Sequence, residues 1–422
     1  MTAFHGRLPR IAACGVALAA WLMAGPGAAR AQIAPPFADL FQQVQDSPRQ
    51  QELIADVDRA EALARQAHAR PNPTVSLTSE NFAGQRPFNG FDQSEDTFQF
   101  NQPVELGGKR RSRIAAGVAG LTAAQARAHE QRVAYAYDLA KAYAAAEIAD
   151  RHIDLAQDEV EEAEADLAAA RALVDVGKES RLRSLQAETE VNAQRVQLDT
   201  ARAERIGAYA RLSALAGQRT TYNALAESML ERLVPMRGAG PIDPQQSAPY
   251  LSAKADSAAA SARVLAARRH ALPDVTVSIG VRRLSANSAN ALVAGISVPL
   301  PLFDRNSGNV DAAQADLRAA QAREAAAELD AQAAITGAQA LNDAADARAL
   351  AADRSRRLAE EAYRLARIAY EAGKAPLMEL LAARHGLGTA RDTLLDARTA
   401  QFEARASLAR LQGRTITGEV IP

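Results

Sequence analysis

The sequence has 422 residues, of which 48% are hydrophobic but only 5% aromatic, because alanine rather than leucine or phenylalanine dominates the apolar content. This composition favours closely packed helices over a thick globular core. The formal net charge is -1 and the pI about 6.6, and no segment combines clustered Lys and Arg with interleaved aromatic residues, which argues against a nucleic-acid partner.

The N-terminal segment has the features of a cleaved secretory signal. Two arginines precede an apolar run at residues 11–24, and a small-residue cleavage site follows at residues 29–31. We therefore expect residues 1–31 to be a signal peptide that is removed on export. The sole cysteine, Cys14, lies at the start of the apolar run, so lipidation there would leave most of that run attached and is the weaker alternative.

The rest of the chain contains one structural unit twice. The segment Ala-Ala-Gln-Ala-Arg at residues 123–127 recurs 196 residues later, and Gly177-Lys178 recurs at the same offset as Gly373-Lys374. The register continues without insertion over roughly ninety residues, which indicates duplication of a whole unit. We predict a first repeat at 32–217, an inter-repeat linker at 218–246, a second repeat at 247–413 and a C-terminal tail at 414–422.

Each repeat should run from a helix through a β-hairpin into a long helical hairpin. In the first repeat we predict a helix at 37–69, a β-hairpin at 74–104 with strands at 74–81 and 96–104, a long helix at 108–176 and a returning helix ending at Gly217. In the second we predict a helix at 248–271, a β-hairpin at 275–299 with strands at 275–282 and 291–298, a long helix at 307–372 and a returning helix ending at Gly413.

The helix lengths predict how these elements pack. A helix of about seventy residues runs ~100 Å, a span that no globular domain needs. In each repeat the summed length of the two shorter helices nearly equals the length of the long helix, so we expect the two to stack end to end along it. Alanines fill the positions between leucines that recur near the helical period, and small residues let helix axes approach closely. These leucines include Leu155, Leu167, Leu317, Leu329, Leu341, Leu350, Leu358 and Leu365.

The strands show a strict alternation that the helices do not explain. Their apolar members are Phe98, Phe100, Val275, Val277, Ile279 and Val281, which alternate with polar or small residues. Transmembrane barrel strands have about nine to eleven residues with this pattern, although a small periplasmic sandwich is an alternative. Beyond the leader no stretch has the ~20 apolar residues of a membrane-spanning helix, so we expect any crossing to use strands. Four strands cannot close a barrel, which takes at least eight, and three copies would supply twelve.

With a signal, two hairpins and two long helical hairpins in tandem, the chain resembles the TolC-like outer membrane factor family over essentially its mature length. Residues 102–110, Gln-Pro-Val-Glu-Leu-Gly-Gly-Lys-Arg, and residues 299–306, Pro-Leu-Pro-Leu-Phe-Asp-Arg-Asn, resemble the strand-to-helix junctions of the CzcC-like heavy-metal branch. The resemblance implies a mainly α fold with transmembrane β structure, a homotrimer with a twelve-strand outer-membrane β-barrel and a twelve-helix periplasmic tunnel. It also implies three kinds of partner: a periplasmic adaptor (membrane fusion protein), an inner-membrane pump of the resistance-nodulation-division type, and outer membrane lipids.

We accordingly expect a passive exit duct in the outer membrane that extends into the periplasm and carries heavy-metal cations. Multidrug or other small-molecule efflux and type I secretion are alternatives within the family, and a non-conducting coiled-coil envelope spacer is an alternative from another class. No nucleophile with a base, phosphate-cradling loop or paired catalytic carboxylates is evident, so we expect no enzymatic activity and no cofactor. Neither the scattered histidines nor the mature methionines Met229, Met236 and Met378 form a ligand pattern, so we expect no metal site and place metal selection in the pump or adaptor.

The strand-to-helix junctions contain the first candidate residues. Gly107 and Gly108 supply backbone freedom where a strand becomes a helix. Lys109 and Arg110, with Arg111 and Arg113 after them, oppose the dipole of the helix that they begin, and we interpret them as a solvated cluster, with a binding site as the alternative. At the second junction, Asp304 and Ser307 are candidate N-caps with a structural role.

The helical tips contain the remaining candidates. Gly177-Lys178 and Gly373-Lys374 are typical of a Gly-terminated helix followed by a cation near its C-terminal dipole. The resemblance implies that these tips close the tunnel and contact the adaptor.

Glu379 lies six residues beyond Gly373, at a spacing that resembles an acidic constriction position of the family, but the second acid of that pattern is replaced by Ala382. The repeat offset places Arg183 at the position equivalent to Glu379. We hypothesise that the two alternate around the tip and pair by charge; two solvated surface charges are the alternative.

Overall fold

The computed structural model of the chain describes residues 32–231 and 242–421. The expected signal peptide, including Cys14, and the middle of the inter-repeat linker, including Met236, lie outside the described residues. The principal elements, in chain order, are α1 (Phe37–Gln43), α2 (Pro48–Ala67), β2 (Thr74–Glu80), β3 (Glu95–Val104), α3 (Lys109–Asp175), α4 (Arg181–Leu215), α5 (Ala248–His270), β5 (Val275–Leu284), β6 (Ala289–Ser297), α6 (Ser307–Glu371) and α7 (Leu377–Leu411). Short pieces complete them: β1 (Ile33–Ala34), β4 (Ala224–Leu225) and the 3-10 turns Val44–Asp46, Phe91–Gln93 and Pro244–Gln246.

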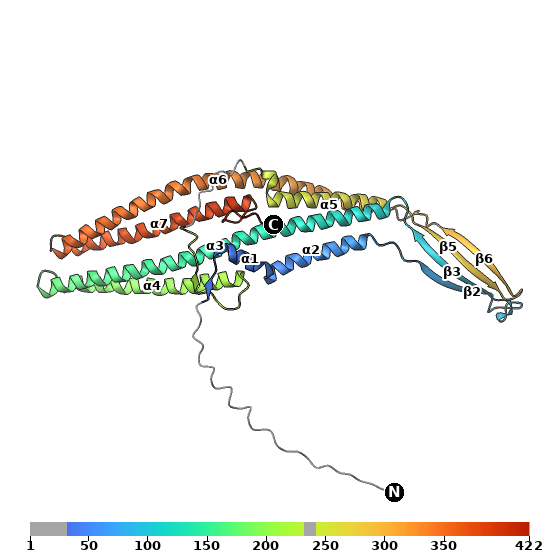
Figure 1. The fold of residues 1–422 in the computed structure, drawn as a ribbon, viewed down its shortest axis with the longest axis horizontal. Helices are drawn as coiled ribbons and strands as arrows, with labels where there is room; N and C mark the ends of the chain where they lie inside the picture. Colours follow the sequence, from blue (N-terminus) through green and yellow to red (C-terminus); the bar gives the residue numbers. More distant parts are fainter. Residues whose placement is uncertain (1–31, 232–241, 422) are drawn as a thin grey trace, which may run out of the picture.

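The molecule is elongated, with the strands at one end and two helical tips at the other (Figure 1). The 67 residues of α3 correspond to ~100 Å of helix. Both α2 and α4 pack along α3, and both α5 and α7 pack along α6. The predicted end-to-end stacking of two short helices on each long one is therefore confirmed. The two repeats are joined by packing of α3 against α5 and α7.

The first helix is not continuous, contrary to the prediction of a single helix at 37–69. It divides into α1 and α2, and Ser47 between them is extended, with φ -66° and ψ 153°. The cause is Pro48, since proline disfavours the helical conformation of the residue before it and is well suited to the first helical position. Ser247, 200 residues later, is also extended and directly precedes α5, in which the proline is the second helical residue, Pro249.

All four long strands form one antiparallel sheet in the order β2-β3-β5-β6. They match the predicted strands within a few residues at each end. The loop of the first hairpin spans residues 81–94 and that of the second only 285–288, so the extra length of the first hairpin lies in its loop. Within the described chain β2 and β6 each have only one neighbour, which leaves two open edges.

The register gives this sheet two chemically different faces. Cross-strand partners such as Leu77, Phe98, Val281 and Leu292 fall in one row, and the rows of this apolar face contain ten large hydrophobic side chains that are exposed in the protomer. They are Val75, Leu77, Phe98, Phe100, Val104, Val277, Ile279, Val281, Leu292 and Ile296. The intervening positions, from Thr74 to Glu80 on β2, form a polar face of mainly Thr, Ser, Gln, Asn and Gly.

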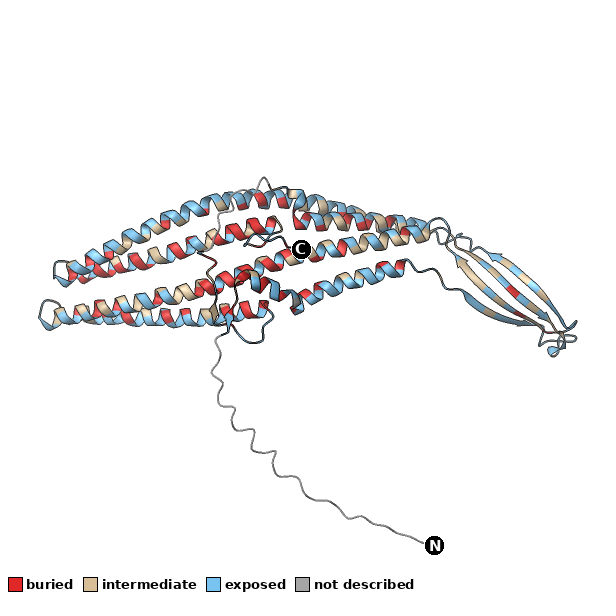
Figure 2. Ribbon diagram, viewed as in Figure 1, coloured by how far each residue is buried: buried red, intermediate tan, exposed pale blue. Residues whose placement is uncertain are grey.

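Alanine forms the helical seams, and Figure 2 shows the buried residues as stripes along the helices. On α6 the buried positions Ala331, Ala338, Ala345 and Ala352 repeat every seven residues. Five of the leucines that recur near the helical period are exposed in the protomer: Leu329, Leu341, Leu350, Leu358 and Leu365. The small seam residues are thus confirmed, while these leucines lie outside the seam of α6. Within the described chain, no helix is both long enough and apolar enough to cross a membrane.

The largest core lies midway along the molecule, where the linker crosses α3. The buried carboxylate of Glu147 on α3 accepts hydrogen bonds from the backbone N–H groups of Met229 and Leu230, at 2.7 and 3.2 Å, and from the Ser228 hydroxyl. Strand β1 pairs with β4 beside it. Because one buried acid satisfies three linker donors, the linker is held to the middle of the long helix.

Candidate functional site

The first strand-to-helix junction depends on its two glycines. Gly107 and Gly108 have φ values of +65° and +78°, a left-handed conformation that glycine adopts without penalty. A Cβ atom on Gly107 would lie 2.1 Å from Leu272 Cδ1 at the end of α5. The predicted need for backbone freedom is confirmed, and at Gly107 lack of space adds to it.

The cations that follow are not a solvated cluster. Arg110 donates to the carbonyl oxygen of His68 at 2.9 Å, and Arg113 donates to those of Ala67 and Ala69 at 3.0 and 2.6 Å. These carbonyls end α2, where the helix dipole is negative and the last acceptors lack partners within the helix. The two arginines therefore begin α3 against its own dipole but cap the neighbouring helix. The interpretation of these two arginines as solvated is wrong, because the carbonyl groups that they contact are over forty residues away in the sequence.

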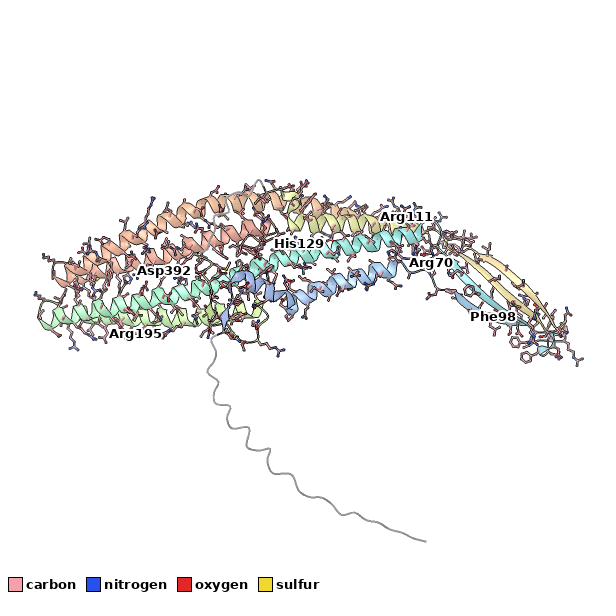
Figure 3. All side chains as sticks on the ribbon, viewed as in Figure 1. Arg70, Phe98, Arg111, His129, Arg195 and Asp392 are labelled. Carbon is pink, nitrogen blue, oxygen red and sulfur yellow. The ribbon has the colours of Figure 1, made fainter. Side chains whose placement is uncertain are left out.

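Lys109 links the two repeats. Its ammonium group lies 2.8 Å from Asp274 Oδ1, just before β5, and its side chain is only 11% exposed. Arg113 also forms an ion pair with Glu105, before α3. Arg111 is exposed at the same junction (Figure 3). The junction thus ties α2, α3 and the start of β5 together.

The second junction uses a different side chain for the same task. Asn306, not Asp304 or Ser307, takes the N-cap position of α6, with φ +58°. Its side-chain amide donates to the carbonyl oxygen of Ala267 near the end of α5, at 2.8 Å. Asp304 accepts the backbone N–H of Asn306 at 2.9 Å, so its role is structural but it precedes the cap. Because Asn306 lies 196 residues after Arg110, the repeats place equivalent residues on equivalent helix ends.

The two helical tips have the same backbone geometry. Gly177 and Gly373 have φ values of +72° and +69°. The next backbone N–H groups, of Lys178 and Lys374, donate to Leu173 and Ala369 at 2.9 and 2.8 Å. This six-to-one bond after a left-handed glycine is a Schellman motif, and it gives the Gly-terminated helix end that the sequence predicted.

The gate candidates occupy equivalent places in the first turns of α4 and α7. The backbone N–H of Arg183 donates to Ser180, and that of Glu379 donates to Pro376, each at the third helical residue. Glu379 is exposed, and Arg183 is half-buried with its guanidinium 3.0 Å from Gln186 Oε1. Within the described protomer the two side chains form no ion pair, so any pairing between them must join different copies.

A buried ionic cluster near the tips was not identified from the sequence. Asp166 of α3 and Arg384 of α7 are only 1% and 4% exposed. Arg384 Nε lies 3.8 Å from Asp166 Oδ2, and its Nη2 lies 2.8 Å from Glu190 Oε1 of α4. Tyr363 of α6 donates its hydroxyl to Asp166 Oδ1 at 3.2 Å. The cluster therefore joins all four helices of the two hairpins.

One sequence signal could have revealed this cluster. Arg384 lies four residues after Leu380 and three before Leu387, which are both buried, so it occupies the apolar stripe of α7. A charge at such a position requires a partner. That partner lies on another helix, which spacing within α7 does not identify.

Burial controls the titration of these acids. It raises the pKa of the Asp166 carboxyl from 3.8 to about 6, and the nearby Arg384 only partly offsets the rise. Burial also raises the pKa of Glu159 on α3, with the charge of Asp392 on α7 adding to the effect (Figure 3). The α3–α7 interface thus contains acids whose pKa values are raised, because desolvation penalises their charged form.

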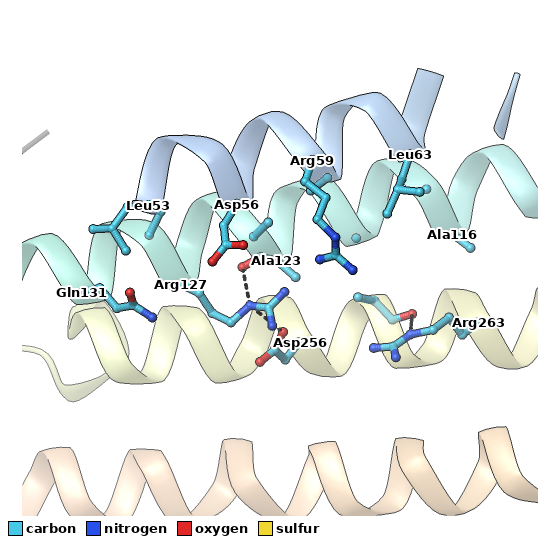
Figure 4. A pocket seen from close by; sticks show the side chains of 16 residues that line it. Leu53, Asp56, Arg59, Leu63, Ala116, Ala123, Arg127, Gln131, Asp256 and Arg263 are labelled. Carbon is cyan, nitrogen blue, oxygen red and sulfur yellow. Dashed lines mark hydrogen bonds and ion pairs between the residues drawn. The ribbon is translucent and has the colours of Figure 1, made fainter. Parts of the chain in front are cut away.

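A groove of about 430 Å³ lies between α2, α3 and α5 (Figure 4). Arg127 of α3 approaches Asp256 of α5 across it, with 3.7 Å between Nε and Oδ1. Small residues such as Gly117 and Ala123 form its floor. In the described residues, no three His, Cys, Asp or Glu side chains are grouped as metal ligands would be.

Comparison with known proteins connects this architecture to efflux. The chain is 39% identical over 407 residues to the nickel-cobalt-cadmium resistance protein NccC of Alcaligenes xylosoxydans xylosoxydans, which covers 96% of this chain and 92% of that protein. It is 41% identical over 281 residues to the nickel and cobalt resistance protein CnrC of Cupriavidus metallidurans, which covers 66% of this chain and 67% of that protein.

A solved structure confirms the fold. The outer-membrane channel OprN superimposes with a TM-score of 0.77 at 21% identity and covers 89% of each chain. The model of the outer membrane efflux protein family matches residues 42–218 and 245–414. The chain therefore belongs to the outer membrane efflux protein family.

Proposed function

We propose that this protein is the exit duct of a tripartite efflux system for heavy-metal cations, assembled as a homotrimer. Its barrel would cross the outer membrane, and its helices would form a periplasmic tunnel that meets an adaptor and an inner-membrane pump of the resistance-nodulation-division type. It would be exported by its N-terminal signal. Transport down this duct needs no catalytic group and no cofactor in the chain.

The four-stranded sheet carries the assembly part of this proposal. Its apolar face has the pattern of a lipid-facing surface and its polar face that of a lumen. Four strands with two open edges cannot close a barrel, whereas three copies would supply twelve and pair every edge. The exposed leucines of α6 support the same conclusion, since large apolar side chains left in solvent favour cover by a second copy.

The substrate proposal rests on NccC, which is named for nickel, cobalt and cadmium resistance, and on CnrC, which is named for nickel and cobalt resistance. The resemblance to NccC extends over nearly the whole chain, so it includes the tips and the strands alike. A duct does not have to select its cargo, and the absence of a ligand group among the described residues is compatible with selection by the pump or adaptor.

We also propose that Glu379 and Arg183 form the periplasmic gate, and that the turns at Gly177-Lys178 and Gly373-Lys374 contact the adaptor. The equivalent first-turn positions support this, because three copies would alternate acid and arginine at similar depth. Such ion pairs would hold the tips of neighbouring copies together, and the tunnel would open when the pairs separate.

Two measurements test the proposed function. Purified protein in a planar bilayer should show discrete conductance steps, and deletion of the gene should sensitise its host to nickel or cobalt but not to large organic antimicrobials. A protein that inserts but never conducts would support the spacer alternative. If returning the gene to the deletion strain restores resistance to drugs but not to metals, the protein is instead a duct for multidrug efflux.

A further inference from the structure

The polar face of the sheet contains a single group of charged residues. Across the four described strands, its only charged members are Glu80 of β2, Glu95 of β3 and Arg282 of β5. Every other position on this face is Thr, Ser, Gln, Asn, Pro, Gly, Ala, Val or Leu. Two acids and one cation leave a net charge of minus one per protomer.

These three residues are held together by direct contacts. Glu80 and Glu95 are cross-strand partners, an arrangement that repels unless a cation lies between them. Arg282 provides it: Nη1 donates to Glu95 Oε2 at 3.0 Å, and Nη2 lies 3.5 Å from Glu80 Oε2. Its Nε donates to Thr97 Oγ1 at 3.0 Å, so the guanidinium bridges β2, β3 and β5.

The group lies at the end of the sheet farthest from the helices. Glu80 and Glu95 flank the loop at 81–94, and Arg282 lies three residues before the loop at 285–288 (Figure 1). The side chains of Arg282, Glu95 and Glu80 remain 35%, 27% and 51% exposed, so their charges act on the space in front of the polar face.

We propose that Glu80, Glu95 and Arg282 set the charge selectivity of the outer mouth of the barrel, favouring cations over anions. The inference rests on the proposed function, in which three copies enclose a lumen lined by the polar face. Three such groups form a ring of net negative charge at the loop end of the strands, near the exit. Arg282 moderates this ring by neutralising one acid, which keeps an exiting divalent cation from being retained.

The neighbouring arginine provides a matched control. Arg283 is adjacent in β5, but its side chain lies on the opposite face, where its cross-strand partner is Asp96. It is exposed and shares the chemistry of Arg282. Neutralising Arg283 removes the same charge from the same strand without changing the lumen.

The experiment measures reversal potentials in planar bilayers under a KCl gradient. At low ionic strength, Arg282→Gln should raise the potassium-to-chloride permeability ratio by about two- to fivefold, and Glu80→Gln or Glu95→Gln should lower it by a similar factor. Arg282→Lys should keep the wild-type ratio, and Arg283→Gln should not change it. Opposite shifts from neighbouring substitutions cannot arise from a general loss of folding.

The salt dependence adds a second readout. The shifts should shrink in 1 M KCl, where charges are screened beyond about 3 Å. Conducting channels whose ratio is the same in wild type, Arg282→Gln and Glu95→Gln would overturn this inference and leave the proposed function intact. Failure of the wild-type protein to conduct at all would overturn both together.

Discussion

At the scale of single residues, the gate candidates and the buried ionic cluster differ in whether their charges are paired with each other within the protomer. Glu379 is exposed at the start of α7 and Arg183 half-buried at the start of α4, and no ion pair joins them within the described protomer. Asp166 and Arg384, in contrast, are buried in the protomer and already paired. The first two suit contacts that open and close, and the second two suit a fixed interface.

The gate proposal makes a prediction for each charge. Glu379→Gln and Arg183→Gln should each raise the open probability in planar bilayers. The rise should be up to about fivefold per pair, because an exposed ion pair would stabilise the closed state by about 0 to 1 kcal/mol. The exchange Glu379→Arg with Arg183→Glu should restore part of the closure. Arg181→Gln, at the exposed start of α4, is the control. Unchanged open probability and unchanged salt dependence in both single variants would refute this gate.

Asp166 makes the stability of the protein depend on pH. Its pKa rises from 3.8 to about 6 on folding, so between these values the folded chain binds more protons than the unfolded chain. Its contribution therefore favours folding at low pH and is lost as the pH rises through about 6, with a magnitude on the order of 2 to 3 kcal/mol.

Thermal unfolding at pH 4 to 7 in detergent checks this sign. Asp166→Asn should lose the part of the pH dependence between about 4 and 6, whereas Asp158→Asn, exposed on the same helix, should keep it. A steeper fall in stability with rising pH in Asp166→Asn than in wild type would contradict the assignment.

At the scale of elements, α6 has buried alanines and exposed leucines. Its alanines pack within the protomer, whereas Leu358 and Leu365, seven residues apart on one side of the helix, are 74% and 52% exposed. In the proposed trimer these two leucines are covered by a neighbouring copy, and burying each one contributes about 1.5 to 3 kcal/mol. They should therefore stabilise the assembly and not the fold of one chain.

Size-exclusion chromatography with light scattering separates these roles. The wild type, extracted in detergent, should be a stable trimer, and Leu358→Glu with Leu365→Glu should shift it toward folded monomer with unchanged helical content. Ser355→Glu, also exposed on α6, should remain trimeric. A wild-type protein that is monodisperse as a monomer yet inserts into membranes would contradict the assembly.

At the scale of the whole molecule, the proposed duct should bind its cargo weakly. The mature chain has no cysteine after the predicted cleavage, and the described residues hold no three-residue ligand group. Calorimetry of the purified trimer with zinc, cobalt, nickel and copper(I) should therefore show no dissociation constant below about 1 μM. A tight, saturable site would show that the channel itself selects metals.

Much of the architecture could be predicted because it depends on local pattern. The 196-residue offset, the alternation around Val277 and Ile279, and the left-handed Gly177 and Gly373 are each readable without neighbours. Periodicity reports which face of an element is apolar, and glycine reports where the backbone must turn. The break before Pro48 is equally local, since proline disfavours the helical conformation of the residue before it.

The sequence by itself determined the duplication, the order of helices and strands, and the two faces of each hairpin, since these follow from spacing along one chain. Only the tertiary structure decided the partners: that Arg110 and Arg113 cap α2, that Asp166 meets Arg384, and that Arg282 bridges Glu80 and Glu95. The physical reason is that a charge is stabilised by whatever lies within a few ångströms of it, and in this fold those neighbours come from segments tens to hundreds of residues away.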